Sequence, residues 1–197
     1  MKLLLAGEGA DDLGGWAHEP AYREKAPELG VVEALLKRVR PDGWEVADAV
    51  RWKDIKKYRV GKGMHGAERR NVLGLALRAD EAGIPIVAFV RDRDRDEERA
   101  SAIAEAMEES GAIFPNVEVI GGAAIEEIDA WLLAIRGRKR SESLGDPKAE
   151  LRGKHGITDA PKKAELVMDA DLSDIADDAE SLRAWLDRAR DVLTPAR

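Results

Sequence analysis

The stretch VAFVRDRDRDEERA, residues 87–100, carries the densest group of potentially reactive side chains in this 197-residue sequence. Four apolar residues precede Asp92, Asp94 and Asp96, which alternate with arginines. Carboxylate oxygens bind hard divalent cations such as Mg²⁺ and Mn²⁺, and in an extended segment Asp92 and Asp94 would share a face. The same acids suit a helix start, with Asp94 as the N-cap and Glu97 at the capping-box position. Taken alone, the segment is compatible with a metal site or with a helix cap.

A second acidic turn, GEGADD at residues 7–12, directly follows the apolar run KLLLA. Asp12 stands where a dinucleotide-binding turn has its third glycine, and Glu8 adds negative charge where a pyrophosphate would bind, so we discount that function. Both acidic segments follow apolar, strand-like runs. Ligands of open parallel sheets bind beyond the carboxyl ends of the strands. We therefore expect Glu8, Asp92 and Asp94 to lie at one edge of a sheet, close enough to share a cation.

The elements that must position these acids follow from the apolar periodicity and from Gly and Pro breaks. Strands are expected within residues 2–6, 44–52, 84–90 and 117–120. Helices are expected within residues 26–40, 66–82, 96–110, 124–136, 161–170 and 177–193. Strands that alternate with helices predict an α/β fold with a mainly parallel sheet sandwiched by helices. We expect this core at residues 1–123 and a C-terminal helical extension at residues 124–197, packed on the core.

A Glu-Gly turn after the first strand and a D-x-D after a later central strand resemble the motifs of the Toprim domain. The matching residues here are Glu8-Gly9 and Asp92-x-Asp94, and the resemblance covers about residues 1–125. It implies a Toprim-like fold and phosphoryl-transfer chemistry dependent on Mg²⁺ or Mn²⁺, with Glu8, Asp92 and Asp94 holding the metal. The family's E-G-x-x-D variant would add Asp12. Asp94-x-Asp96 also satisfies the D-x-D pattern, which makes Asp96 a further candidate.

The segment IEEIDAWLLA, residues 125–134, resembles small stand-alone Toprim-like bacterial proteins related to OLD-family nucleases. On a helix, Glu126 and Asp129 would be i, i+3 neighbours beside an apolar stripe, whereas Glu127 would face away. Glu126 is therefore a further metal candidate and Asp129 a weaker one. OLD nucleases supply a lysine from a region after the D-x-D, a part that Lys162 or Lys163 could take.

Residues 51–70 form a basic segment, with eight Lys or Arg against two acids, and interleave Trp52 and Tyr58 with the cations. Phosphate contacts and base stacking need these residue types. An ordinary lysine-rich surface loop has the same composition, so both interpretations stay open. The nucleic-acid-binding candidates are Lys53, Lys56, Lys57, Arg59 and Lys62.

The composition limits the classes of protein that need considering. The net charge of −7 argues against a uniformly basic nucleic-acid binder, although the charge is unevenly distributed. Without cysteine there is no disulfide framework and no thiolate metal site. The longest apolar runs are too short to cross a bilayer. We expect a cytoplasmic protein that does not bind membranes, and a homo-oligomer is compatible with the sequence.

These features together predict a metal-dependent nuclease, a hydrolase acting on DNA or RNA, in a bacterial defence or repair system. The sequence has no Walker A motif, so an ATPase partner would be a separate subunit. The alternative is a catalytically silent Toprim-like module that binds nucleic acid or such an ATPase.

Overall fold

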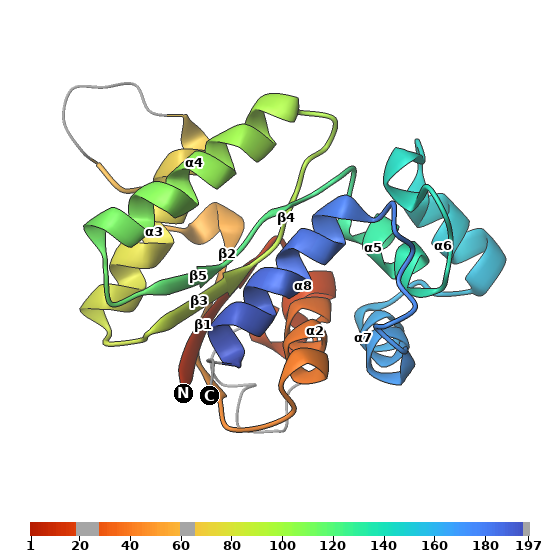
Figure 1. Cartoon of the computed structure of the whole chain (residues 1–197), viewed down its shortest axis with the longest axis horizontal. Helices are drawn as coiled ribbons and strands as arrows, with labels where there is room; N and C mark the ends of the chain where they lie inside the picture. Colours follow the sequence, from red (N-terminus) through yellow and green to blue (C-terminus); the bar gives the residue numbers. More distant parts are fainter. Residues whose placement is uncertain (19–27, 60–65, 195–197) are drawn as a thin grey trace.

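A four-stranded parallel sheet in the order β2-β1-β3-β5 forms the centre of the molecule (Figure 1). The computed structural model describes residues 1–18, 28–59 and 66–194. The strands are β1 (Lys2–Gly7), β2 (Glu45–Arg51), β3 (Ile86–Phe89) and β5 (Glu118–Ile120). A short parallel pair, β4 (Arg91–Asp92) with β6 (Ala123–Ala124), follows the ends of β3 and β5. The predicted α/β fold with a mainly parallel sheet is confirmed.

The central strands are apolar throughout because both of their faces are covered. Along β1, Leu3 and Leu5 belong to the hydrophobic cluster on one face, whereas Leu4 and Ala6 belong to the cluster on the other. All four are fully buried. This is the arrangement expected of a parallel sheet that lies between two helical layers.

Two pairs of helices form those layers. Helices α3 (Ala67–Glu81) and α4 (Glu97–Ile113) cover one face, and α2 (Val31–Val39) and α8 (Glu180–Leu193) cover the other (Figure 1). Trp185 of α8 is fully buried, and its Nε1 donates a hydrogen bond to the carbonyl of Phe89 at 2.9 Å. The C-terminal helix therefore completes the core layer, while the domain boundary at residue 123 stays a prediction.

Three helices extend the molecule beyond one end of the sheet (Figure 1). These are α5 (Ile128–Ile135), α6 (Pro147–His155) and α7 (Ala160–Asp169). Short helical turns make up the connections: α1 (Ala10–Leu13), η1 (Gly14–Ala17), η3 (Trp52–Asp54) and η4 (Ser141–Ser143). Within the described residues, no helix is both long and apolar enough to cross a membrane.

Several predicted helix boundaries are wrong. Helix α4 continues past Gly111 to Ile113, because a helical glycine with open space around it need not end a helix. Helix α2 begins at Val31, although residues 28–30 were expected to be helical. The helix expected from residue 124 begins only at Ile128, because residues 123–124 pair as a strand.

Candidate active site at the carboxyl edge of the sheet

The ends of β1 and β4 bring two of the predicted acids together. Glu8 directly follows β1, and Asp92 ends β4. The backbone N–H of Asp92 donates a hydrogen bond to Oε1 of Glu8 at 3.2 Å. The prediction that Glu8 and Asp92 lie at the same edge of the sheet is therefore confirmed.

A pocket of about 390 Å³ opens at this edge, and we call it the acidic pocket. It is built from the turn after β1, the end of β4, and the first residues of α5 and α6. Its lining residues are Glu8, Gly9, Ala10, Asp11, Asp12, Asp92, Glu127, Ile128, Asp129 and Lys148. The pocket thus gathers far more negative than positive charge.

Asp12 folds back against the end of β1. Its Oδ2 accepts a hydrogen bond from the backbone N–H of Glu8 at 2.5 Å. A Cβ at position 7 would lie 2.5 Å from the Cβ of Asp12, so this turn requires Gly7. Burial raises the pKa of Asp12 to about 7, and the nearby charge of Asp11 adds to the effect.

Asp92 lies against the start of α5. Its Oδ1 accepts a hydrogen bond from the backbone N–H of Ile128 at 2.8 Å, an interaction that favours the ionised carboxylate at a helix N-terminus. Burial outweighs that bond, and together with repulsion from Asp12 it raises the pKa of Asp92 to about 7. The backbone hydrogen bonds to Asp12 and Asp92 and the charge of Lys163 near Asp12 do not offset burial, and in this sense we call these two neighbouring acids uncompensated.

Lys163 pairs with two other acids that line the pocket. Its Nζ lies 2.8 Å from Oδ2 of Asp11 and 2.6 Å from Oδ1 of Asp129. Burial lowers the pKa of Lys163, but the two ion pairs outweigh burial and raise it overall. The structure therefore brings Lys163 and the buried Asp129 to the candidate site. Lys162, in contrast, is exposed and lies 3.4 Å from Oδ2 of Asp159.

Residues 91–99, which we call the arginine loop, contain arginines that pair with Glu8 and Asp94, whereas Asp92 of this loop lines the acidic pocket. Arg91 forms an ion pair with Glu8, and Nη1 of Arg99 lies 2.7 Å from Oδ2 of Asp94. Asp94 has a left-handed backbone with φ of 50°, so the expectation that Asp92 and Asp94 share the face of an extended segment is wrong. The loop turns here instead of continuing the strand.

The N-cap of α4 is Asp96, so the alternative that assigned the cap to Asp94 is wrong in its register. The Oδ1 of Asp96 accepts a hydrogen bond from the backbone N–H of Arg99 at 3.1 Å. This bond satisfies one of the free donors at the helix start. Asp96 does not line the acidic pocket.

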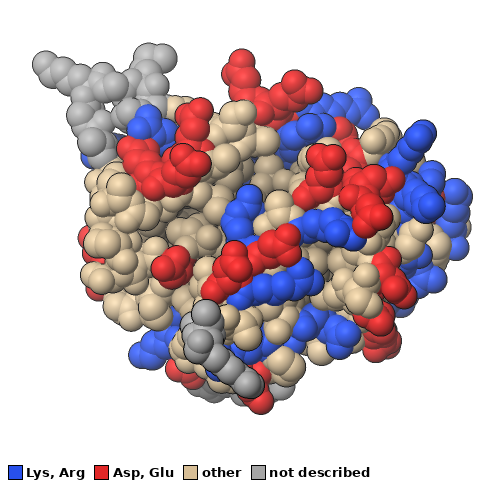
Figure 2. Space-filling view, in the orientation of Figure 1, with Lys and Arg blue, Asp and Glu red and all other residues tan. Residues whose placement is uncertain are grey.

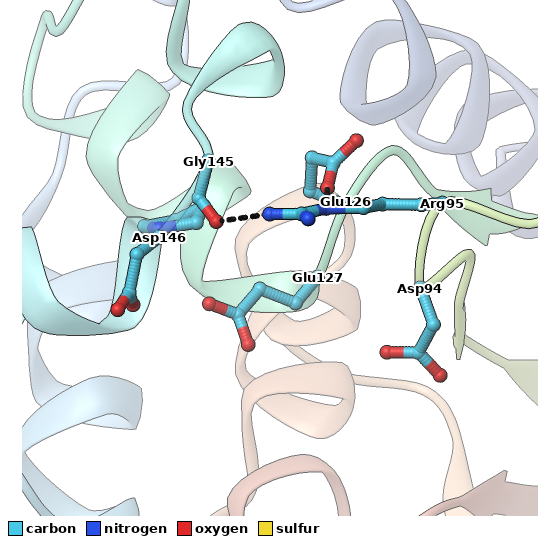
Figure 3. Close-up of a pocket in the computed structure, with 7 residues that line it drawn as sticks. Asp94, Arg95, Glu126, Glu127, Gly145 and Asp146 are labelled. Carbon is cyan, nitrogen blue, oxygen red and sulfur yellow. Dashed lines mark hydrogen bonds and ion pairs between the residues drawn. The ribbon is translucent and has the colours of Figure 1, made fainter.

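A second pocket of about 280 Å³ adjoins the first (Figure 3). Glu126 lines it and pairs with Arg93 at 2.9 Å and with Arg95 at 3.4 Å. Arg95 also donates a hydrogen bond to the carbonyl of Gly145 at 2.8 Å. Glu126 has φ of 63° and precedes α5, so its predicted helical position next to Asp129 is wrong. The structure places Glu127 in both pockets and Glu126 only in the second.

Within residues 1–18, 28–59 and 66–194, no three or more His, Asp or Glu side chains are arranged to hold a metal ion as they stand. Glu8 instead forms an ion pair with Arg91, and Asp94 forms one with Arg99. The donor chemistry nevertheless fits a hard cation, because Asp12 and Asp92 supply adjacent oxygens whose charge a cation would neutralise. Glu8 could join them by exchanging Arg91 for a cation.

The basic segment offers exposed cations, and of its two expected stacking residues Trp52 is buried and Tyr58 is half-buried against the ring of Phe114. Its candidates Lys53, Lys56, Lys57 and Arg59 are exposed, whereas Lys62 lies outside the described residues. Trp52 is only 6% exposed, packs against Phe89, and donates from Nε1 to Glu68 at 2.8 Å, so it is not available to stack on a base. On the face shown in Figure 2, acidic and basic side chains are interspersed.

Sequence reasoning missed several residues of this edge. Asp11 and Glu127 line the acidic pocket together with Lys148, and Arg91 and Arg99 neutralise acids at its rim. The strict alternation of charge in RDRDRD was a usable signal, because closely spaced acids and bases tend to pair. No comparable signal marked Lys148.

No family model matches the chain, and no curated protein or solved structure does so either. The geometry of the described residues therefore carries the functional argument.

Proposed function

We propose that this protein is a nuclease of the Toprim type that uses Mg²⁺ or Mn²⁺ in the acidic pocket. One observation carries the proposal: Asp12, in α1 just after β1, and Asp92, at the end of β4, line the same pocket, and both have a pKa of about 7. Perturbed carboxyls in a concave site at the carboxyl edge of a parallel sheet mark a candidate for catalysis.

Glu8, Asp12 and Asp92 are the residues that would hold the cation. The cation would polarise the phosphodiester and stabilise negative charge on the leaving oxygen. Glu8 is exposed and close enough to the pocket to accept or donate a proton. The structure gives Asp94 an ion pair with Arg99 and gives Asp96 a capping role, so neither is among the principal ligands in this proposal.

The exposed cations of the basic segment would hold the DNA or RNA backbone near the pocket. Replacing Lys53, Lys56, Lys57 and Arg59 together by Gln should weaken nucleic-acid binding. The slope of log K against log salt should flatten by about 0.9 for each duplex phosphate that the variant no longer binds. Unchanged affinity and slope would mean that this segment is an ordinary surface loop.

The second candidate is a catalytically silent module that binds nucleic acid or a separate ATPase subunit, in a defence or repair system. The observation that favours it is the ion pair between Arg91 and Glu8, which occupies an acid that a metal-dependent enzyme would need. This ion pair is compatible with a metal-dependent nuclease only if a cation can displace Arg91 from Glu8.

Cleavage assays separate the two candidates. Purified protein should cleave DNA or RNA with Mg²⁺ or Mn²⁺, and EDTA should stop the reaction. Asp92→Asn should abolish cleavage, because it removes one of the two uncompensated carboxylates. Asp96→Asn is the matched control, since Asn caps a helix as well as Asp does. If the wild type, with and without an ATPase partner, neither cleaves nor gains thermal stability from either cation, the silent module is the better account.

A further inference from the structure

Two arginines lie side by side at the rim of the acidic pocket, and we call Arg91 and Arg99 the arginine pair. The Nε atoms of Arg91 and Arg99 lie 3.4 Å and 3.3 Å from the same Oε1 of Glu68 on α3. Their side chains are only 13% and 15% exposed. Trp52 fixes Glu68 from the other side through its Nε1, and its ring lies under Arg91. Contacts with Glu68 and Trp52 therefore hold the arginine pair in place on its buried side.

The outer ends of the two guanidinium groups face one carboxylate. Oδ2 of Asp94 lies 2.7 Å from Nη1 of Arg99 and 3.9 Å from Nη1 of Arg91. The side chain of Asp94 is 57% exposed, so this anion covers the arginine pair from the solvent side. Two fixed guanidiniums around one exposed oxyanion form the arrangement that binds phosphate oxygens in proteins.

We propose that the arginine pair binds one phosphate group of a nucleic-acid backbone, and that the carboxylate of Asp94 takes this place when no phosphate is bound. The inference rests on the proposed function and adds its substrate-contacting residues. Because the Asp94 side chain is 57% exposed, water weakens its attraction to the two arginines, so a phosphate can displace it at small cost. In this proposal a phosphate displaces Asp94 from the arginine pair, and the acids of the acidic pocket bind the cation.

Arg91 links this phosphate site to the acidic pocket. Its Nη1 contacts Glu8, which lines the pocket, and also faces Asp94. Glu8 releases Arg91 when it turns to a cation, and Arg91 can then donate fully to the phosphate. Cation and phosphate should therefore strengthen each other's binding, and by the same factor in both directions.

Binding of a fluorescently labelled single-stranded oligonucleotide, measured by anisotropy in EDTA at low salt, tests the phosphate site without any catalysis. Asp94→Asn should tighten binding roughly threefold, because it removes the competing carboxylate while the arginine pair stays in place. Glu97→Gln is the matched control: it removes the same charge from an exposed position three residues away. Adding Arg91→Gln to Asp94→Asn should return the affinity to the wild-type value or below.

The outcomes separate this inference from the proposed nuclease activity. No gain in Asp94→Asn, or an equal gain in Glu97→Gln, would overturn the phosphate site and leave Asp94 as a structural partner of Arg99, whatever the cleavage assay shows. A gain in Asp94→Asn alone would support the phosphate site even if the wild type, with and without an ATPase partner, neither cleaves nor gains thermal stability from either cation, a result that would reject the nuclease. The oligonucleotide is used with and without a 5′-phosphate. A gain confined to the phosphorylated form would reject a backbone phosphate as the ligand.

Discussion

The acidic pocket and the arginine loop lie at the same edge of the sheet, share Asp92 and are both rich in carboxylates, yet the electrostatics of their other acids differ. In the arginine loop, Asp94 pairs with Arg99, and Asp96 caps α4. In the acidic pocket, Asp12 and Asp92 have pKa values raised to about 7 by burial. The comparison shows that the density of acids along the sequence does not reveal which acids lack compensation. Burial and neighbouring charges in the folded structure determine which acids lack compensation. One of these acids, Asp12, lies in the segment GEGADD.

The largest expected change in stability concerns Lys163, which compensates two acids of the pocket. Lys163→Met should lower the free energy of unfolding by about 3–5 kcal/mol, because it leaves Asp11 and Asp129 without their buried cation. Urea denaturation measures the loss. Lys162→Met, at the exposed neighbouring position, should change the free energy of unfolding by less than about 0.5 kcal/mol. Equal effects of the two variants would show that the buried ion pairs do not form as described.

The second prediction is a smaller change in stability, of opposite sign, and concerns the uncompensated acid Asp12. The pKa of Asp12 is about 7 in the folded protein, above the value of 3.8 for a free aspartate. The folded state therefore binds more protons than the unfolded state between these values, and stability falls as the pH rises through this window. Asp12→Asn should remove the contribution of Asp12 to that dependence and leave the contribution of Asp92.

The measurement is urea unfolding of wild type and Asp12→Asn in EDTA. At about pH 8 the variant should be more stable by at least about 1 kcal/mol, because one pKa unit corresponds to about 1.4 kcal/mol. Near pH 3 the difference should vanish, since this pH lies below both pKa values and the acid is mostly neutral in both states. A variant that is less stable at pH 8 would mean that another group compensates Asp12.

The smallest effect concerns Asp96 in the arginine loop. Asp96→Ala removes the N-cap of α4 and should cost about 1 kcal/mol of stability, measured by urea denaturation. The loss should be the same with and without Mg²⁺. A loss that grows when the cation is present would identify Asp96 as a ligand, and the contrast between the two regions would then be incorrect.

The positions of Glu8 and Asp92 were predictable from the sequence, whereas some backbone conformations and long-range contacts were not. Apolar runs that end at Gly7 and at Val90 placed Glu8 and Asp92 at the same edge, because the carboxyl ends of parallel strands lie together. The left-handed residues Asp94 and Glu126 were not predictable, since neither is a glycine and only tertiary contacts hold them there. The pairing of Lys163 with Asp11 spans 152 residues, a distance at which local patterns carry no information.

The central claim is that the uncompensated acids Asp12 and Asp92 bind a divalent cation. The most direct measurement is calorimetric titration of Mn²⁺ or Mg²⁺ near pH 7 in two buffers with different ionisation enthalpies. We expect binding with proton release, because a cation favours the ionised form of acids that titrate near this pH. Asp92→Asn should weaken binding at least about tenfold and reduce the proton release, whereas Asp96→Asn should not. No binding by the wild type, or unchanged binding by Asp92→Asn, would contradict the account.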